Sequence, residues 1–443
     1  MAYTETLIMA AANAAPRGVE RLIRGVVASD RLLGWTSAVT QRTIRRVKRT
    51  DRIAVVSDTN IGDAVVLQGA CSAFKRWLPG CEIDYFYQRK AQPLLRANPF
   101  IDGHQPVFTD ADFTSARNRR AVQTAIRERK YDLILNLYPF LMNSELAGAG
   151  CPVLVPYKLI ADIVRAERNP TTKAHVALHL HRFVDRIAQS LAGRPDIAAA
   201  EADHVENIMY LAEDVPARAC EILRDAGVTD DANIAFLNPD SSSRFSCIPL
   251  PMQTELLRRL LVLDRYDRVL LGPAYSFVEI PDKLCAQLAG DPGLGKLVRL
   301  PQGIPIDTYA GLIDRADLFI TADTAQMHLA AARRVAPGLG GGFRNRTTLV
   351  SIFGATHSRV YGYDSFAQGY LDSSQDAPAK VFEGAPPCKN LTCIHKTRKN
   401  CRTVECFTGL SAATVLGWIE TRHRPLGPAQ RATGALVRIG GRE

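Results

Sequence analysis

Short apolar runs alternate with stretches of helical periodicity along most of the chain. In the first half, runs at 55–56, 83–86, 133–135 and 153–155 predict strands, and 64–77 and 116–129 have helical patterns. Helical pieces at 201–232, interrupted by Pro216 and Gly227, precede a second series of runs at 234–237, 268–271, 297–300, 318–320 and 349–352. This alternation predicts an α/β fold of two domains, each with a parallel sheet covered on both faces, and a cleft between them.

The composition is that of a globular protein. The 443 residues are 47% hydrophobic and 23% charged, which is enough for two or three domains with cores of their own. No apolar run approaches the roughly 18 residues of a membrane span, and the N-terminus lacks the pattern of a secretory signal. We therefore expect a cytoplasmic location.

Positive charge is concentrated near the N-terminus. The net charge is +10, and nine basic residues between Arg17 and Arg49 face only Glu20 and Asp30, interleaved with apolar residues. This predicts one or two basic amphipathic helices in an extension over 1–50. They could lie peripherally on the inner face of an anionic membrane, or pack on the protein body or on a neighbouring subunit of a homo-oligomer. Nucleic acid is not expected, because no aromatic platform accompanies the charge.

The segment 317–332 carries the most specific chemical signal. An apolar run gives way to small and polar residues and then to a helical pattern. The free N–H groups of such a helix start, with the positive end of the helix dipole, can hold a phosphate, and Asp323 and His328 would then lie beside it. The alternative is an ordinary helix start capped by Thr324 or Asp323.

Several motifs occur together in a recognisable order. Ile61-Gly62-Asp63-Ala64-Val65-Val66-Leu67 follows the first strand, and later come 78–84, 94–102, 131–137, Leu237-Asn238-Pro239, the segment around Asp323, and Gly354-Ala355-Thr356 after the run 349–353. In this order they resemble glycosyltransferase family 9, the ADP-heptose heptosyltransferases, over residues 51 to 424. The resemblance implies the GT-B fold, two Rossmann-like domains facing a central cleft. The acceptor domain would be 51–215, the nucleotide-sugar domain 216–425, and 426–443 a flexible tail.

The resemblance assigns donor-binding roles in the second domain. Arg244 would neutralise the donor phosphates, although this family usually has a lysine followed by an aromatic residue and a proline there. Asp323 would bind sugar hydroxyls, and His328 would either bind phosphate or brace the turn. Backbone donors to the phosphates would come from Thr324, Ala325 and Gln326, with alanine where most relatives have glycine.

Two glycines mark further parts of the expected site. Gly272 resembles the family's loop near the nucleotide, for which Glu279 is the nearest acidic partner. Gly62 would let the backbone approach the cleft beside Asp63. Since Asp63 directly follows a strand, its carboxylate can accept the proton of an attacking hydroxyl, and the resemblance places the family's catalytic base there. The alternative for Asp63 is an acid at a helix start.

The acceptor is less well defined. In relatives the first domain binds it, and Asn143 and Arg182 are the candidate contacts on that side. A lipopolysaccharide core would suit the basic N-terminus, whereas the extension and the insertion 337–346 are unusual for enzymes that act on that core. A protein or another glycoconjugate is the alternative acceptor.

Four of the ten cysteines lie in a lysine-rich segment with little apolar content, 386–407. Cys388, Cys393, Cys401 and Cys406 could bind structural zinc or iron, form a metal-free thiol cluster, or form disulfides, the last disfavoured in the cytosol. The other six lie in core-like segments. The resemblance includes protein-modifying heptosyltransferases that carry cysteine-bound iron.

No catalytic metal is expected, because GT-B enzymes use protein cations and helix dipoles. Asp110 and Asp112 form an Asp-x-Asp pattern that we interpret as a solvated loop.

The sequence thus predicts an inverting transferase that moves heptose or a similar sugar from ADP-heptose to a hydroxyl. The alternatives are a nucleotide-sugar epimerase or hydrolase on the same scaffold, and a noncatalytic metal-dependent interaction protein.

Overall fold

The structure, a computed structural model, describes residues 38–57, 60–108, 116–137, 146, 150–156, 175–194, 208–241, 244–333, 347–363, 379–385 and 405–425. The chain forms two compact units, Met1–Asn207 and Ile208–Glu443, so the division lies eight residues before the sequence-based boundary at 215/216. The residues that open the second unit already belong to it, because the Met209 N–H donates to Ala332 O at 2.8 Å.

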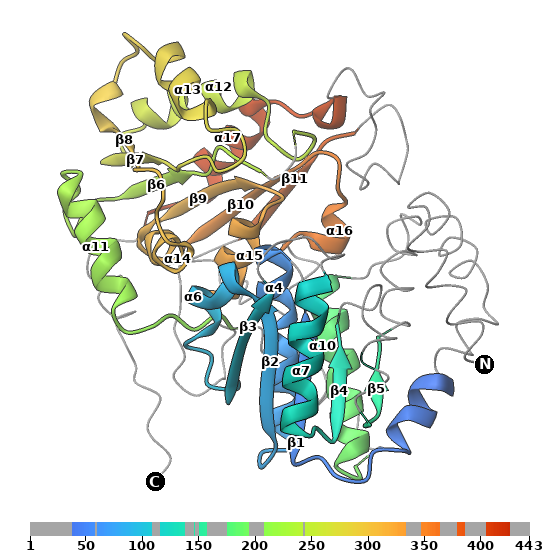
Figure 1. The fold of residues 1–443 in the computed structure, drawn as a ribbon. Coiled ribbons are helices and arrows are strands. Elements are labelled where there is room, and N and C mark those ends of the chain that lie inside the picture. The colour runs from blue at the N-terminus through green and yellow to red at the C-terminus, as the bar shows by residue number, and fades with distance from the viewer. Residues whose placement is uncertain are drawn as a thin grey trace. The chain divides into compact units, whose positions relative to one another are not determined.

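Unit 1 is built on a five-stranded parallel sheet in the order β3-β2-β1-β4-β5 (Figure 1). Its strands are β1 (Arg52–Ser57), β2 (Glu82–Gln88), β3 (Gly103–Phe108), β4 (Leu133–Asn136) and β5 (Val153–Leu154). Its helices are α4 (Ile61–Leu67), α5 (Gly69–Trp77), α6 (Gln92–Leu95), α7 (Ala116–Arg129) and α10 (Val176–Leu191), with a 3-10 turn η1 (Arg89–Ala91). The strand order reverses between β1 and β4, which is where such sheets bind ligands.

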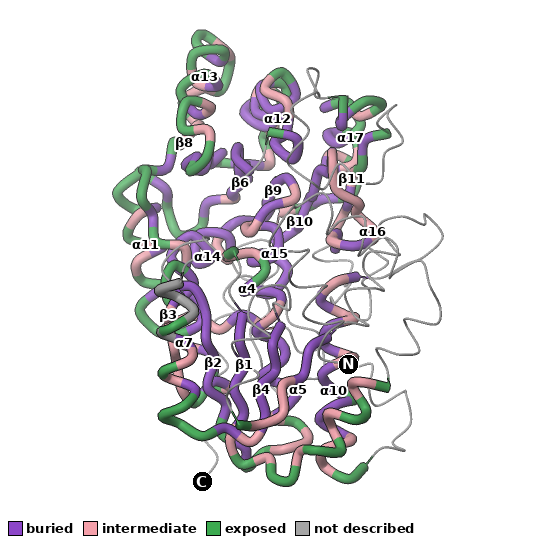
Figure 2. Tube along the Cα trace, turned by 45° about the vertical axis from the view of Figure 1, so that its right-hand side comes forward, coloured by how far each residue is buried: buried purple, intermediate pink, exposed green. Residues whose placement is uncertain are grey.

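Helices cover both faces of this sheet. Val122 and Ile126 of α7 pack on Ala54, Val56 and neighbouring apolar residues of one face. On the other face α5 packs against α10, and the Trp77 indole N–H donates to the buried Asp185 carboxylate at 2.5 Å. The central strands are therefore buried on both sides, as Figure 2 shows.

Unit 2 contains a six-stranded parallel sheet in the order β11-β10-β9-β6-β7-β8. The strands are β6 (Ile234–Leu237), β7 (Arg268–Leu271), β8 (Leu297–Arg299), β9 (Leu318–Ala322), β10 (Thr348–Phe353) and β11 (Ala379–Glu383). The helices are α11 (Val215–Asp225), α12 (Leu250–Val262), α13 (Ile280–Gln287), α14 (Ile306–Arg315), α15 (Ala325–Ala332), α16 (Ser358–Tyr361) and α17 (Ala412–Arg422), with 3-10 turns η3 (Leu294–Lys296) and η5 (Glu405–Phe407). The order reverses between β6 and β9.

The C-terminal end of α15 is held by an ion pair of the buried Arg333. Arg333, 1% exposed, donates from Nε and Nη2 to Asp314 Oδ2 at 2.8 and 2.6 Å, and from Nη1 to Met209 O at 2.6 Å. A buried guanidinium needs such partners, because an unpaired buried charge is strongly destabilising. The helix that begins at the candidate site thus has a fixed far end.

The predicted α/β fold class is confirmed, and every predicted strand is present. The strands β3 and β11 were not predicted, since β3 contains Pro106 and polar residues and β11 contains the charged Lys380 and Glu383. The helical segment 64–77 forms two helices that meet at Gln68. The helical piece predicted between Pro216 and Gly227 is α11: Pro216 lies in its first turn, where its missing N–H costs nothing, and Gly227 follows its end. No helix in the described residues is long and apolar enough to cross a membrane.

Candidate functional site

Four loops of unit 2 meet at the carboxyl edge of its sheet. They follow β10 (354–356), β9 (323–324), β6 (238–241) and β7 (272–276), and because all four strands are parallel neighbours, their ends lie side by side. The central pair, β9 and β6, flanks the reversal of strand order. Ligands of open α/β sheets bind at this position.

The turn between β9 and α15 presents a helix start. Thr324 precedes the helix with extended backbone (φ −146°, ψ 171°), and its side chain caps no backbone N–H. Met327 N–H and His328 N–H donate to Thr324 O at 3.2 and 3.4 Å. The N–H groups of Ala325 and Gln326 therefore have no acceptor within the helix, and they point along the positive end of its dipole.

Asp323 is fixed by the loops on either side of it. The Thr356 hydroxyl donates to Asp323 Oδ2 at 2.6 Å, and the Ser241 hydroxyl donates to Asp323 O at 3.3 Å. Close packing holds the Thr356 loop, because a Cβ on Gly354 would lie 2.6 Å from the Phe407 ring. Ser241 and Thr356 were not predicted as site residues. The place of Thr356 directly after β10, the neighbour of β9, is the signal that could have indicated it.

The β6 loop is tied to its neighbours by buried polar groups. Asn238 Oδ1 accepts from the Tyr309 hydroxyl at 2.9 Å, and Asn238 Nδ2 donates to Asp240 O at 2.9 Å and to Thr321 Oγ1 at 3.1 Å. Gly272 is required beside this network, since a Cβ there would lie 2.7 Å from the Tyr309 hydroxyl. In the structure Gly272 thus has a packing role.

Asp240 joins the β6 loop to the β7 loop. It is 5% exposed, and its Oδ2 accepts from the backbone N–H groups of Tyr275 and Ser276, each at 2.6 Å. No described group donates to its buried Oδ1. Asp240 was not predicted as a site residue. Glu279, which was the candidate acidic partner of the Gly272 loop, lies exposed at the start of α13 and pairs with Lys283.

His328 is buried beneath the turn. It is 8% exposed, its Nδ1 lies 2.9 Å from the Tyr363 hydroxyl, and the two rings meet edge to face. Burial lowers the pKa of His328 to about 4, so the ring is neutral at pH 7. Of the two roles left open by the sequence, this geometry favours bracing the turn over binding phosphate as a cation.

Arg244 lies at the rim of the same edge. It is exposed, and its guanidinium lies over the Phe245 ring, 4.7 Å from the ring centroid. Phe245 is in turn buried against the core. The ring thus positions the guanidinium itself at an exposed place on this edge, where it can contact an anion.

In unit 1, Asp63 lies in the first turn of α4, just after β1, and is exposed. Asn60 precedes the helix, and its side-chain oxygen accepts from Lys90 Nζ at 3.0 Å. Gly62 and Arg182 are half-buried, the latter on α10. Asp63 therefore has the position after a strand that the sequence predicted, at the β1/β4 reversal of strand order.

Several predicted residues lie outside the described part of the chain. These are Asn143, Asp110, Asp112, Cys388, Cys393, Cys401, the insertion 337–346 and residues 1–37 of the N-terminal extension. Cys406 is described: it lies in η5, is 3% exposed and packs in the core of unit 2. Within the described residues, no three side chains are grouped as metal ligands.

Comparison with known proteins gives one sequence relative and several similar folds. No protein-family model matches the chain. Lipopolysaccharide heptosyltransferase 3 of Escherichia coli (strain K12) is 24% identical over 306 residues, which cover 67% of this chain and 80% of that protein. The crystal structure of a glycosyl transferase of family 9 from Veillonella parvula superposes with a TM-score of 0.61 at 17% identity, covering 84% of this chain and 97% of that one.

Two E. coli structures have the same fold. ADP-heptose lipopolysaccharide heptosyltransferase II has a TM-score of 0.56 at 15% identity, covering 83% of this chain and 97% of its own. Heptosyltransferase WaaC with ADP has a TM-score of 0.52 at 14% identity, covering 84% and 99%. The two parallel sheets are those of a GT-B glycosyltransferase. In sequence and in fold the chain is similar to heptosyltransferases of glycosyltransferase family 9, the family that its motifs resemble.

The neutral state of His328 makes stability depend on pH. Its pKa is lower in the folded protein than the ordinary 6.5, so the unfolded chain takes up the proton first as the pH falls. The contribution of His328 is therefore complete above about pH 6.5 and is lost toward pH 4, by about 3 kcal/mol. In chemical denaturation, His328→Gln should lose about that much less stability than the wild type between pH 7 and 4. Equal losses in both proteins would contradict a buried neutral ring.

Asp240 should control the order of the β7 loop. Asp240→Ala removes the acceptor of two backbone N–H groups, each bond to a charged group being worth about 2 kcal/mol. We expect hydrogen exchange at the amides of Tyr275 and Ser276 to become on the order of 30-fold faster. Asp240→Asn is the matched control, since its amide oxygen can still accept. Unchanged protection in the alanine variant would show that Asp240 does not hold the loop.

Proposed function

We propose that the enzyme transfers heptose from ADP-heptose to an acceptor hydroxyl with inversion at the anomeric carbon. The observation that carries the proposal is the turn before α15, at the β9/β6 reversal, with Asp323 held by Thr356 and Ser241. A relative in sequence is a heptosyltransferase, and one solved structure of the same fold contains ADP.

The donor would be held mainly by unit 2. Its diphosphate would accept hydrogen bonds from the backbone N–H groups of Thr324, Ala325 and Gln326, and Arg244 would neutralise charge that builds on the leaving ADP. Asp323 would bind hydroxyls of the transferred sugar. The unpaired Oδ1 of Asp240 also suits a hydroxyl, because a carboxylate oxygen accepts a proton donor and repels phosphate.

The chemical step would need one base. Asp63 would accept the proton of the acceptor hydroxyl as that oxygen attacks the anomeric carbon, while the bond from that carbon to the phosphate oxygen breaks and ADP leaves. A single displacement inverts the configuration. Cations and helix N–H groups would stabilise the leaving ADP, so no catalytic metal is needed.

The acceptor would contact unit 1. We assign it to Gly62, Asn143 and Arg182 and propose a hydroxyl of the lipopolysaccharide core, in line with the name of the sequence relative. A protein or another glycoconjugate is the alternative, and the cytoplasm is the proposed location.

A structural metal is a separate part of the proposal. Cys388, Cys393, Cys401 and Cys406 would bind zinc or iron tetrahedrally, supported by their grouping in a segment with little apolar content. The burial of Cys406 beside Phe407 would anchor that segment to the core of unit 2. The metal would stabilise the segment and take no part in transfer.

Asp63→Asn tests the assignment of the base. We expect kcat to fall by on the order of 100-fold to 10,000-fold, because the amide cannot take the proton. Calorimetric binding of ADP-heptose should be unchanged, since the donor loops belong to unit 2. Glu128→Gln, an exposed change on α7, is the control.

Undiminished transfer by Asp63→Asn would remove Asp63 as the base. Release of free heptose or of an epimerised nucleotide sugar, at the same rate with and without acceptor, would instead support the hydrolase or epimerase alternative.

A further inference from the structure

Gln253 is a fully buried amide in the first turn of α12. Its Nε2 donates to Ile248 O at 2.7 Å and to Pro239 O at 3.0 Å, so both bonds end on backbone carbonyls. These two carbonyls lie at the ends of the segment 239–248, which joins β6 to α12. The proposed transfer reaction assigns no role to Gln253.

Cys247 strengthens the same closure. It is 8% exposed, and its thiol donates to Pro239 O at 3.4 Å, so this carbonyl accepts from two side chains. Burial raises the pKa of Cys247 to about 12, so the thiol keeps its proton at pH 7. The two ends of the segment 239–248 are therefore tied together by Gln253 and Cys247.

A buried glutamine is unfavourable at this position unless its bonds are needed. Its Oε1 is buried as well, and no described residue donates to it. Burying an amide with an unpaired oxygen costs free energy that an apolar side chain of similar length would not cost. Met252, Leu256 and Leu257 of the same helix are apolar and belong to the core of unit 2. Residues that break such a pattern are expected mainly at functional sites.

The segment 239–248 carries groups that face the donor in the proposed reaction. The Ser241 hydroxyl donates to Asp323 O, and Arg244 is the cation expected beside the diphosphate. Both residues lie between the two carbonyls that Gln253 holds. If the ends of the segment move, these groups move with them, and a misplacement of about 1 Å can lower a rate about 100-fold.

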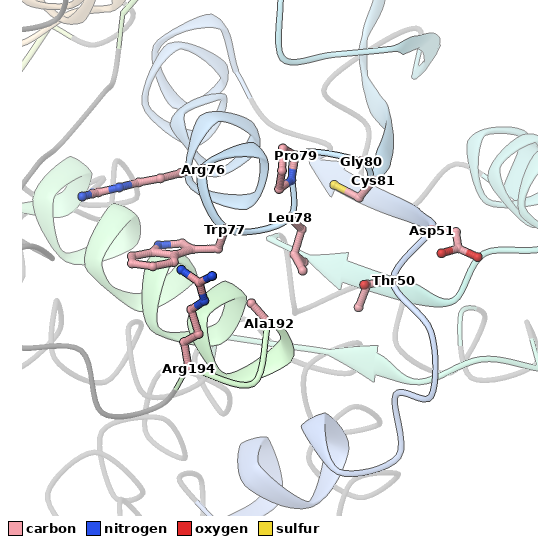
Figure 3. A pocket seen from close by; sticks show the side chains of 10 residues that line it. All are labelled: Thr50, Asp51, Arg76, Trp77, Leu78, Pro79, Gly80, Cys81, Ala192 and Arg194. Atoms are coloured by element: carbon pink, nitrogen blue, oxygen red, sulfur yellow. The ribbon is translucent and has the colours of Figure 1, made fainter.

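A buried polar contact in unit 1 has a different place in the fold. Trp77 and Arg76 line a pocket of about 540 Å³ at the amino end of that sheet (Figure 3). Both contact the buried Asp185, which joins α5 to α10. That contact holds two helices together, whereas the bonds of Gln253 end on a segment of the candidate site.

We propose that Gln253 is a positioning residue for the donor: by holding the carbonyls of Pro239 and Ile248, it fixes the segment from which Arg244 contacts the diphosphate. The inference rests on the proposed function, since Arg244 has the role assigned to it there. Because Gln253 is fully buried, it touches no substrate and acts through the segment.

Gln253→Met tests the proposal, because methionine fills a similar space and cannot donate a hydrogen bond. In calorimetric titration the variant should bind ADP on the order of 10-fold more weakly than the wild type. Thr254→Val is the matched control, since the buried Thr254 hydroxyl bonds to Leu250 O and Gln287, away from the segment. This control should bind ADP as the wild type does, and thermal melting establishes that both variants fold.

A double-mutant cycle separates positioning from a general structural role. Arg244→Gln should weaken ADP binding on the order of 10-fold, and adding Gln253→Met should weaken it by no more than about twofold further. Losses that multiply in the double variant would show that Gln253 does not act through Arg244 and would overturn the proposal.

Alkylation of Cys247 gives a readout that needs no ligand. The thiolate is the reactive form, so labelling of this buried thiol requires the segment to open. In Gln253→Met, iodoacetamide should label Cys247 on the order of 10-fold faster, while the half-buried Cys285 of α13 is labelled at an unchanged rate. Unchanged labelling of Cys247, or equal acceleration at both cysteines, would overturn the proposal.

The two proposals fail in different ways. Wild-type protein that binds no ADP would contradict the donor site, and with it this role of Gln253. Normal ADP binding by Gln253→Met would overturn the role of Gln253 alone and leave the donor site intact.

Discussion

The hydrogen bond between Thr356 and Asp323 joins the loops on which the site of unit 2 depends. Asp323 lies between the loops after β10 and β6, and the second of these is bonded to the β7 loop through Asp240. Each loop is thus held by its neighbour across parallel strands whose register is fixed by the sheet. A helix start becomes a specific anion site only when the groups around it are held in this way.

Burial determines the charge state of the groups beneath this edge. His328 is neutral because burial removes the water that would stabilise its charged form. The side chains of Tyr309 and Tyr363 are buried as well. At the surface, the helix dipole and Arg244 favour an anion, whereas the carboxylates of Asp323 and Asp240 favour hydroxyl donors beside it.

The sequence predicted the strands that are continuous apolar runs, such as β1, β6 and β9, because burial on both faces leaves that pattern. It could not predict β3, where Pro106 and polar residues occur at a sheet edge. The positions of Asp63 and Asp323 followed from their place after strands. The partners Thr356, Ser241 and Asp240 were missed because they are distant in sequence from the groups they contact, 33 residues separating Thr356 from Asp323. The roles of Gly272 and His328 likewise depended on burial, which short motifs do not record.

Calorimetric titration with ADP-heptose, UDP-glucose and GDP-mannose tests most directly the claim that the carboxyl edge of unit 2 is a nucleotide-sugar site. The account predicts that ADP-heptose binds and that the other two bind much more weakly, with binding lost in Asp323→Ala. If folded protein binds none of the three, the donor site proposed here is contradicted, and only the family fold remains.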